Sequence, residues 1–292
     1  MFDLDYEEPL FRPPSEAESL ILQVTIGCSH NRCAFCSMYQ TKKFRVRPLT
    51  ELQAEIVAAR QALGPDVGRV FLADGDAMCL SPRRLIELLD AVNAAFPRLQ
   101  RVSAYANARD IAAKSDAELA ELRQRKLKLL YLGLESGDDV TLAATDKGAT
   151  ADEIVTAVQR ARAAGVATSV MVLIGLAGRE RSFEHARLSA AAINRMAPEF
   201  TALLTYTPVP MSPLFERIAA KVFELPGPRE SIAEIREFVD RLDCRTYFTC
   251  NHASNYLPLT GRLPTNKRRL LELLDAALAG EIQLKPEFLR GL

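Results

Sequence analysis

Short apolar segments alternate with amphipathic segments along the first two-thirds of the chain. Each apolar segment has the length of a strand, contains β-branched residues, and is followed by a loop and then by residues at helical spacing. Six repeats of strand and helix indicate a parallel sheet with right-handed crossovers. The expected strands are residues 20–26, 70–73, 102–106, 129–134, 168–174 and 201–207.

Six strand–helix units are fewer than the eight of a closed barrel. The pattern therefore predicts an α/β fold with a partial (β/α)6 barrel, and a doubly wound open sheet is the alternative. Helices are expected to begin at capping boxes near Thr50, Ser115 and Thr150, at Ser81-Pro82, and at Ser182, with the last of them ending near Met196.

The pattern changes after Pro208, where prolines become frequent and two further helices are expected near residues 229–242 and 267–278. We therefore expect three parts: an N-terminal arm at 1–17, the barrel at 18–215, and a C-terminal α-rich extension at 216–292. The extension is expected to add no further strand–helix unit. It is a candidate lid over a substrate.

Charge and composition narrow the functional classes. The chain has 37 basic and 37 acidic residues, so its formal net charge is zero, which does not favour nucleic-acid binding. No run approaches about 18 apolar residues, so no membrane span is expected. The N-terminal residues are acidic and proline-rich rather than typical of a secretion signal. We expect a cytoplasmic protein with reduced cysteines.

Parallel α/β folds bind ligands at the carboxyl ends of their strands. The residues that follow the six expected strands are therefore the candidate site. They are Gly27-Cys28, Asp74-Gly75-Asp76, Asn107, Glu135-Ser136-Gly137, residues 175–180 and residues 208–210.

Three cysteines, Cys28, Cys33 and Cys36, lie within nine residues after the first expected strand. A structural zinc site with His30 as fourth ligand is one interpretation. A four-iron cluster is the other, and three thiolates would leave one of its irons without a protein ligand. We expect the cluster, because the loop lies at the ligand-binding edge of a large domain and a catalytic centre needs an open position.

The segment GCSHNRCAFC resembles the cluster-binding loop of the radical S-adenosylmethionine (radical SAM) enzymes, in which the usual spacing is Cys-x3-Cys-x2-Cys with an aromatic residue before the last cysteine. Phe35 fits the aromatic position. The first interval differs from the family pattern, because four residues separate Cys28 from Cys33.

Further motifs carry the resemblance across residues 18–215. Residues 73–76 are similar to the family segment that binds the amino group of SAM, and 133–137 to the segment that holds the ribose. Asp146-Lys147 resembles a pair whose basic member meets the SAM carboxylate. Residues 175–180 resemble the segment beside adenine, and 207–210 the end of the sixth strand. Taken together, the motifs resemble the branch of the family that contains the Elongator-type, methylthiotransferase-type and coproporphyrinogen-oxidase-type domains. They do not identify a subfamily.

The resemblance implies that Cys28, Cys33 and Cys36 hold a [4Fe-4S] cluster and that SAM is the second cofactor. The implied SAM-binding residues are Phe35, Asp74, Gly75, Asp76, Tyr105, Asn107, Glu135, Ser136, Lys147, Gly175 and Leu176. It further implies reductive cleavage of SAM to a 5′-deoxyadenosyl radical, which abstracts hydrogen from an unidentified substrate. The electron donor would be a flavodoxin or a ferredoxin.

Two other functions remain open on the same fold. One is an oxidoreductase like coproporphyrinogen oxidase, and the other is a non-catalytic chaperone for haem or metal. Cys79, Cys244 and Cys250 are too few for a second cluster and are expected to be buried thiols.

Three other parts of the sequence also lead to predictions. The basic segment 42–47 either binds an anionic substrate or forms a solvated turn. His185 is expected on a helix surface. Residues 244–260 combine neutral polar and aromatic side chains and are expected to cover the barrel mouth.

Overall fold

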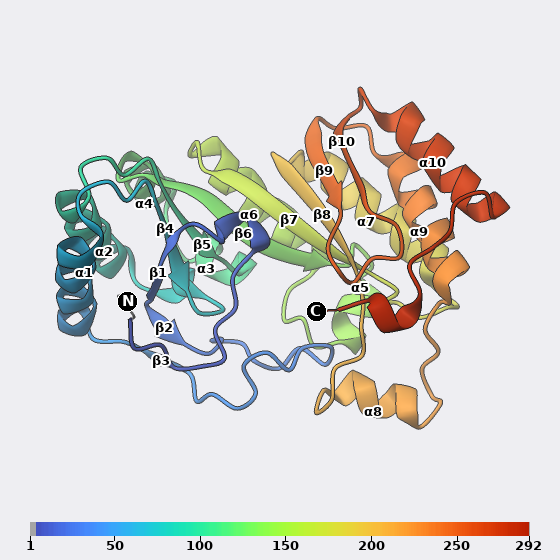
Figure 1. Ribbon diagram of the computed structural model, residues 1–292, viewed down its shortest axis with the longest axis horizontal. Helices are drawn as coiled ribbons and strands as arrows, with labels where there is room; N and C mark the ends of the chain where they lie inside the picture. Colours follow the sequence, from blue (N-terminus) through green and yellow to red (C-terminus); the bar gives the residue numbers. More distant parts are fainter. Residues whose placement is uncertain (1–3, 292) are drawn as a thin grey trace. The chain divides into compact units, whose positions relative to one another are not determined.

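The computed structural model describes residues 4–291 and divides the chain into two compact units (Figure 1). The first unit contains residues up to 31, residues 38–132 and residues 159–168. The second contains residues 32–37, 133–158 and 169 onward. Strand β6 (Leu127–Glu135) and helix α6 (Ala151–Ala163) run through both units.

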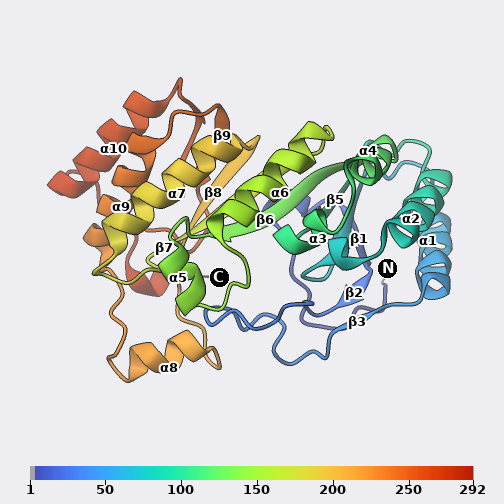
Figure 2. The same ribbon diagram turned by 180° about the vertical axis from the view of Figure 1, so that it is seen from behind.

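The first unit is a parallel sheet in the order β1-β4-β5-β6 with helices beside it. Helices α1 and α2 lie side by side (Figures 1 and 2). The elements of this unit are η1 (Pro14–Glu16), β1 (Leu20–Gln23), β2 (Thr25–Ile26), β3 (Arg45–Val46), α1 (Leu49–Leu63), β4 (Arg69–Ala73), η2 (Ala77–Cys79), α2 (Pro82–Ala95), β5 (Arg101–Tyr105), α3 (Ala108–Ala112) and α4 (Asp116–Gln124).

The N-terminal arm covers one face of this sheet. Tyr6 and Leu10 pack against an apolar cluster that includes Phe71 and Tyr131. Glu16 of η1 is fully buried, and its carboxylate accepts hydrogen bonds from the Tyr131 hydroxyl at 2.6 Å and from Arg101 at 2.7 Å. Because a buried carboxylate is costly without partners, these bonds fix the arm against the sheet.

The second unit continues with the strand order β6-β7-β8-β9-β10. Strands β7, β8 and β9 are parallel, and β10 is antiparallel to β9. Helix α9 packs against both α7 and α10 (Figure 2). The elements are α5 (Asp139–Ala144), β7 (Ala167–Ile174), α7 (Ser182–Met196), β8 (Phe200–Thr205), α8 (Pro213–Ala219), α9 (Pro228–Arg241), β9 (Thr246–Cys250), β10 (Leu259–Leu263), α10 (Lys267–Ala279) and η3 (Glu287–Leu289).

The expected fold class is confirmed: the structure is an α/β fold with a mostly parallel eight-stranded sheet, consistent with a partial barrel. All six expected strands are present, although the first is interrupted between β1 and β2. Ser115 forms the expected capping box with Glu118, and Thr150 exchanges the same bonds with Glu153. The box expected at Thr50 is wrong, because α1 begins one residue earlier and Pro48 is its N-cap.

The expectation that the C-terminal segment adds no strand–helix unit is also wrong. Strand β9 lies parallel to β8 after α9, with Thr201 opposite Phe248, so the parallel sheet continues. Its residues alternate between the core and the outside, which is a strand pattern. The prolines at 208–228 interrupt the connection and not the sheet. The part boundaries at 17 and 215 stay a prediction.

No helix in the described part of the chain is both long and apolar enough to cross a membrane.

Candidate functional site

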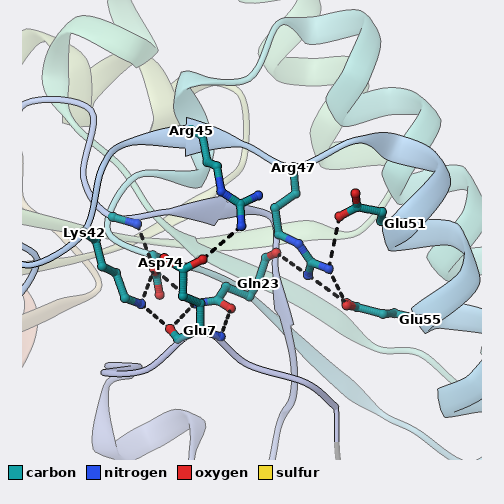
Figure 3. Close-up of polar contacts among 9 residues, drawn as sticks. Glu7, Gln23, Lys42, Arg45, Arg47, Glu51, Glu55 and Asp74 are labelled. Carbon is teal, nitrogen blue, oxygen red and sulfur yellow. Dashed lines mark hydrogen bonds and ion pairs between the residues drawn. The ribbon is translucent and has the colours of Figure 1, made fainter.

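Asp74, directly after β4, holds the start of the cysteine loop. Its side chain is fully buried, and Oδ2 accepts hydrogen bonds from the Gly27 backbone N–H at 2.9 Å, Lys42 Nζ at 2.9 Å and Gln23 Nε2 at 3.1 Å (Figure 3). Burial raises the pKa of Asp74, and the bonds from Gly27, Lys42 and Gln23 oppose that shift. Asp74 therefore fixes the backbone one residue before Cys28.

The basic segment 42–47 is engaged within the protein. Lys42 is buried, pairs with Asp74, and also donates to the Glu7 carbonyl. Arg45 pairs with the Glu7 carboxylate at 2.9 Å, and Arg47 pairs with Glu55 at 2.5 Å (Figure 3). A solvated turn is thus the wrong interpretation for Lys42, whose ammonium is covered because it neutralises a buried carboxylate.

Gly75 lies where two side chains leave no space. A Cβ atom at this position would approach Cε2 of Tyr39 to 2.6 Å and Cβ of Cys28 to 3.1 Å. The Gly75 N–H donates to the Gly27 carbonyl at 3.3 Å. The first unit therefore brings Gly75 beside the first cysteine, as expected for neighbouring members of one site.

Asp76 has unused hydrogen-bonding capacity. Its side chain is fully buried, Oδ2 accepts a hydrogen bond from Ser29, and Oδ1 has no partner among the described residues. Burial, and next the neighbouring Asp110 carboxylate, raise the pKa of Asp76 to about 7. The amide Nδ2 of Asn107 likewise has no partner within the described chain. An unsatisfied buried carboxylate oxygen is typical of a place that a ligand completes.

Tyr105 has a packing role. Its ring meets Phe71 edge to face at 5.2 Å and Tyr131 at 6.1 Å between centroids. Burial raises the pKa of the Tyr105 hydroxyl above its usual range. The expected contact of Tyr105 with SAM stays a prediction.

Glu135 and Lys147 form the polar site in the second unit. Their Oε1 and Nζ atoms lie 3.1 Å apart, and each side chain is only 12% exposed. Glu135 ends β6 with a φ of 60°, in the left-handed region. A Cβ atom at Gly133 would collide with the Glu135 carboxylate, so a larger residue there would displace this side chain from its present position. The structure thus brings together two residues twelve positions apart that the resemblance places on SAM.

The later part of the cysteine loop also belongs to the second unit. The Ala34 N–H donates to the Thr145 carbonyl at 2.8 Å, and the Ala34 carbonyl accepts from the Leu214 N–H at 2.8 Å. Phe35 packs against an apolar cluster that contains Leu176 and Tyr206. Two of the expected SAM-binding residues, Phe35 and Leu176, therefore share one apolar surface.

Sequence reasoning missed a buried polar network beside this site. His185 was expected at the surface, and this is wrong: it is fully buried, with Nδ1 2.8 Å from Glu234 Oε1 and Nε2 3.2 Å from the Glu135 carbonyl. The signal lay in the helical spacing, because His185 falls on the same face of α7 as Ser189 and Ile193, which are also buried. Gly175 also meets Glu234, through its N–H at 3.0 Å. Ser136, the remaining expected residue, is fully buried and accepts a hydrogen bond from the Asp138 N–H.

The three remaining cysteines are covered to different extents. Burial raises the pKa of Cys250 to about 12, and burial with Asp76 and Asp110 raises that of Cys79 to about 12. Both side chains therefore keep the thiol proton at neutral pH. Cys244 is half-buried and donates to the Ile193 carbonyl. No three His, Cys, Asp or Glu side chains within residues 4–291 are grouped around a place for a single metal ion.

Comparisons with known proteins place these residues in a family. The sequence profile described as the radical SAM superfamily matches residues 22–186. No curated protein matches the chain.

Three solved structures illustrate the similarity. Coproporphyrinogen III oxidase (HemN) from Escherichia coli has a TM-score of 0.61 and 19% identity, over 76% of this chain and 51% of that one. The methyltransferase TsrM from Kitasatospora setae has a TM-score of 0.58 and 18% identity, over 92% and 55%. Methylornithine synthase (PylB) has a TM-score of 0.55 and 17% identity, over 92% and 74%.

At sequence identities below 20%, the structural similarity shows the fold alone. This chain spans about half the length of coproporphyrinogen oxidase. The sequence profile covers more than half of the chain and includes the cysteine loop, residues 74–76 and the Glu135–Lys147 pair. The chain therefore belongs to the radical SAM superfamily, a superfamily of enzymes that use a [4Fe-4S] cluster and S-adenosylmethionine as cofactors.

Proposed function

We propose that the chain is a catalytic radical SAM enzyme that acts on a substrate still to be identified. The observation that carries this proposal is the Glu135–Lys147 pair, because an acceptor and a cation 3.1 Å apart and mostly covered at a strand end suit a cofactor that has both hydroxyls and a carboxylate. When bound, the cluster and SAM would supply the one-electron and radical chemistry for hydrogen abstraction. The protein binds them, orients them and excludes water.

The residues fit these groups by their chemistry. Cys28, Cys33 and Cys36 would hold the cluster. The unsatisfied Oδ1 of Asp76 would accept the SAM ammonium, Lys147 would meet the carboxylate, and Glu135 the ribose hydroxyls.

The other residues that are expected to bind SAM each have a role in the proposal. Phe35 and Leu176 would supply an apolar surface for adenine, with Gly175 and Ser136 at the adjoining turns. Tyr105, Asn107 and Gly75 would border the Asp76 side of the cofactor. Asp74 would hold the Gly27 backbone through Oδ2, and its buried Oδ1, which also has no partner among the described residues, would remain available to SAM.

The proposal extends to an electron donor and a location. A low-potential protein such as a flavodoxin or ferredoxin would reduce the cluster, and a reduced compartment, the cytoplasm, would preserve its thiolate ligands. An oxidoreductase reaction like that of coproporphyrinogen oxidase is the second candidate. It rests on the likeness of fold to that enzyme. Detection of 5′-deoxyadenosine after anaerobic reduction with SAM separates either enzyme from a non-catalytic chaperone.

The segment 244–260, expected to cover the barrel mouth, is largely part of the sheet, because β9 takes up residues 246–250 and β10 begins at 259. We propose that the loop at 251–256 between them contacts the substrate. Because β9 runs parallel to β8, this loop follows the carboxyl end of its strand. Asn255 is buried and bonds to the Thr205 N–H and the Leu203 carbonyl, which fixes the loop on the end of β8. Arg290 donates to the Ser254 carbonyl and lies 4.2 Å from the centre of the Tyr256 ring. The C-terminal segment thus holds the loop in place.

The cluster assignment predicts the outcome of exchanging two sets of cysteines. Replacing Cys28, Cys33 and Cys36 by Ala removes the thiolates, so anaerobically reconstituted protein should lose its roughly four irons and its broad absorption. Replacing Cys79, Cys244 and Cys250 by Ser is the matched control and should leave iron content unchanged. Iron in the first variant equal to that in the second would contradict the assignment.

The two aspartates after β4 should behave differently. Asp76→Asn removes the proposed partner of the SAM ammonium and should weaken SAM binding by about 1.5–3 kcal/mol, the range for a hydrogen bond to a charged group. Asp74→Asn leaves Lys42 buried without its charge partner and should lower the melting temperature, with a cost of about 3–5 kcal/mol. Titration calorimetry and thermal unfolding measure the two effects. An Asp76 variant with unaltered SAM affinity would show that Asp76 is not the ammonium partner.

Lys147→Ala tests the carboxylate partner. We expect SAM affinity to fall by about 1.5–3 kcal/mol while iron content stays constant, because Lys147 donates charged hydrogen bonds but is not a cluster ligand. Arg83→Ala, which removes a cation from an 88% exposed side chain on α2, is the control and should bind SAM normally. Equal SAM affinity in the two variants would exclude Lys147 from the site.

Arg290→Ala tests the loop at 251–256. Without Arg290 the loop loses the bond to the Ser254 carbonyl and the cation beside the Tyr256 ring, while the bonds from Lys285 to Ala253 and Tyr256 remain. The loosened loop should let solvent reach the cofactor, so SAM cleavage without substrate should rise. Iron content should not change. Arg268→Ala, on the exposed face of α10, is the control. If both variants release 5′-deoxyadenosine at the parent's rate, the loop has no shielding role.

A further inference from the structure

A closed polar network lies among α7, α9 and the ends of β6 and β7. His185 and Glu234 are fully buried, and Ser182 is 5% exposed. The Glu234 carboxylate accepts hydrogen bonds from Ser182 Oγ at 2.5 Å and from the Gly175 N–H at 3.0 Å, and it lies 2.8 Å from His185 Nδ1. The other ring nitrogen, Nε2, is 3.2 Å from the Glu135 carbonyl oxygen.

The partners fix the tautomer of His185. A carbonyl oxygen only accepts, so Nε2 carries a proton and donates to Glu135. Nδ1 and the Glu234 carboxyl share the next proton, and the pair is neutral as a whole wherever that proton lies. Gly175 donates to the same oxygen, Oε1, that faces His185, and Ser182 satisfies the other oxygen, Oε2. Every polar group of the network therefore has a partner, which is the condition under which burial of such groups is tolerated.

The network acts on two strand ends at once. Glu135 has a φ of 60°, a conformation that costs a residue with a side chain about 1 kcal/mol or more. The His185 bond to the Glu135 carbonyl holds this turn. Gly175, at a φ of 85°, is held through its N–H by Glu234. Glu234 belongs to α9, so a helix of the C-terminal segment fixes the turns after β6 and β7.

We propose that His185 and Glu234 are positioning residues that set SAM affinity through Glu135 without touching SAM. The left-handed turn directs the Glu135 carboxylate to Lys147, and the network keeps the turn in that conformation. The inference rests on the proposed function, in which Glu135 and Lys147 bind the cofactor. A network that only stabilises the core is the competing explanation.

Two substitutions at His185 separate these explanations in the cluster-loaded full chain. His185→Leu removes the donor to Glu135 and should weaken SAM binding about tenfold, the equivalent of one hydrogen bond. His185→Gln keeps an amide N–H near the position of Nε2 and should restore most of the affinity. Ile193→Ala, a buried position on the same helix, lowers stability without reaching Glu135, and should bind SAM as the parent does.

Normal SAM affinity in a folded His185→Leu protein would overturn the proposal, as would a loss shared equally with Ile193→Ala. If His185→Leu does not fold, Glu234→Gln takes its place. This substitution keeps the side-chain volume but weakens the hydrogen bond to His185 Nδ1. Nitrogen-15 spectra of the full chain give an independent measurement. Nε2 of His185 should be protonated, and an unprotonated Nε2 would overturn the proposal.

A double substitution distinguishes this inference from the proposed function. Glu135→Ala should weaken SAM binding, and adding His185→Leu should weaken it no further, because the histidine acts through Glu135. Additive losses would overturn the positioning role alone. Unchanged affinity in Glu135→Ala would overturn the proposed role of Glu135, and the inference with it.

Discussion

One carboxylate oxygen, Oδ2 of Asp74, organises the start of the cysteine loop. It gathers three hydrogen bonds from three separate segments: the end of β1, the loop itself and the returning basic segment. A buried charge requires this much compensation, so none of the three segments can move without exposing or abandoning it. The position of the backbone before Cys28 therefore depends more on the hydrogen bonds and charge pairing of this buried carboxylate than on regular secondary structure.

Buried acidic side chains in the second unit are also paired with hydrogen-bond donors. Glu135 at the end of β6 lies beside Lys147, and Glu234 on α9 lies beside His185 on α7, so each acidic group is matched with a donor from another segment. Asp138 follows the rule as well, because Arg181 donates two hydrogen bonds to it and keeps the pKa of Asp138 below its usual value despite burial. Asp74 and Asp76, both in the turn after β4, differ from these groups, since the Oδ1 atom of each is buried and not matched by any described residue.

Much of this arrangement could be predicted from the sequence. Hydrophobic periodicity located the six strands, and capping residues located the starts of α2, α4 and α6, because both signals are local. The polar residues after each strand followed from the topology. The seventh parallel strand was missed because prolines precede it and because its pattern, TYFTC, is short. Lys42 and His185 were misread for a related reason: whether a titratable side chain is buried depends on partners such as Asp74 and Glu234, which lie 32 and 49 residues away.

The buried carboxylate of Glu16 has a consequence for synthesis. Its partner Tyr131 lies 115 residues further along the chain. A ribosome that adds about 5–20 residues per second needs on the order of 10 s to reach it. During that time the arm can already bond to Ile21, Gln23 and Arg45, but Glu16 lacks the Tyr131 hydroxyl and the apolar cluster that includes Phe71 lacks the Tyr131 ring. The burial of Glu16 can therefore be completed only after β6 has been synthesised.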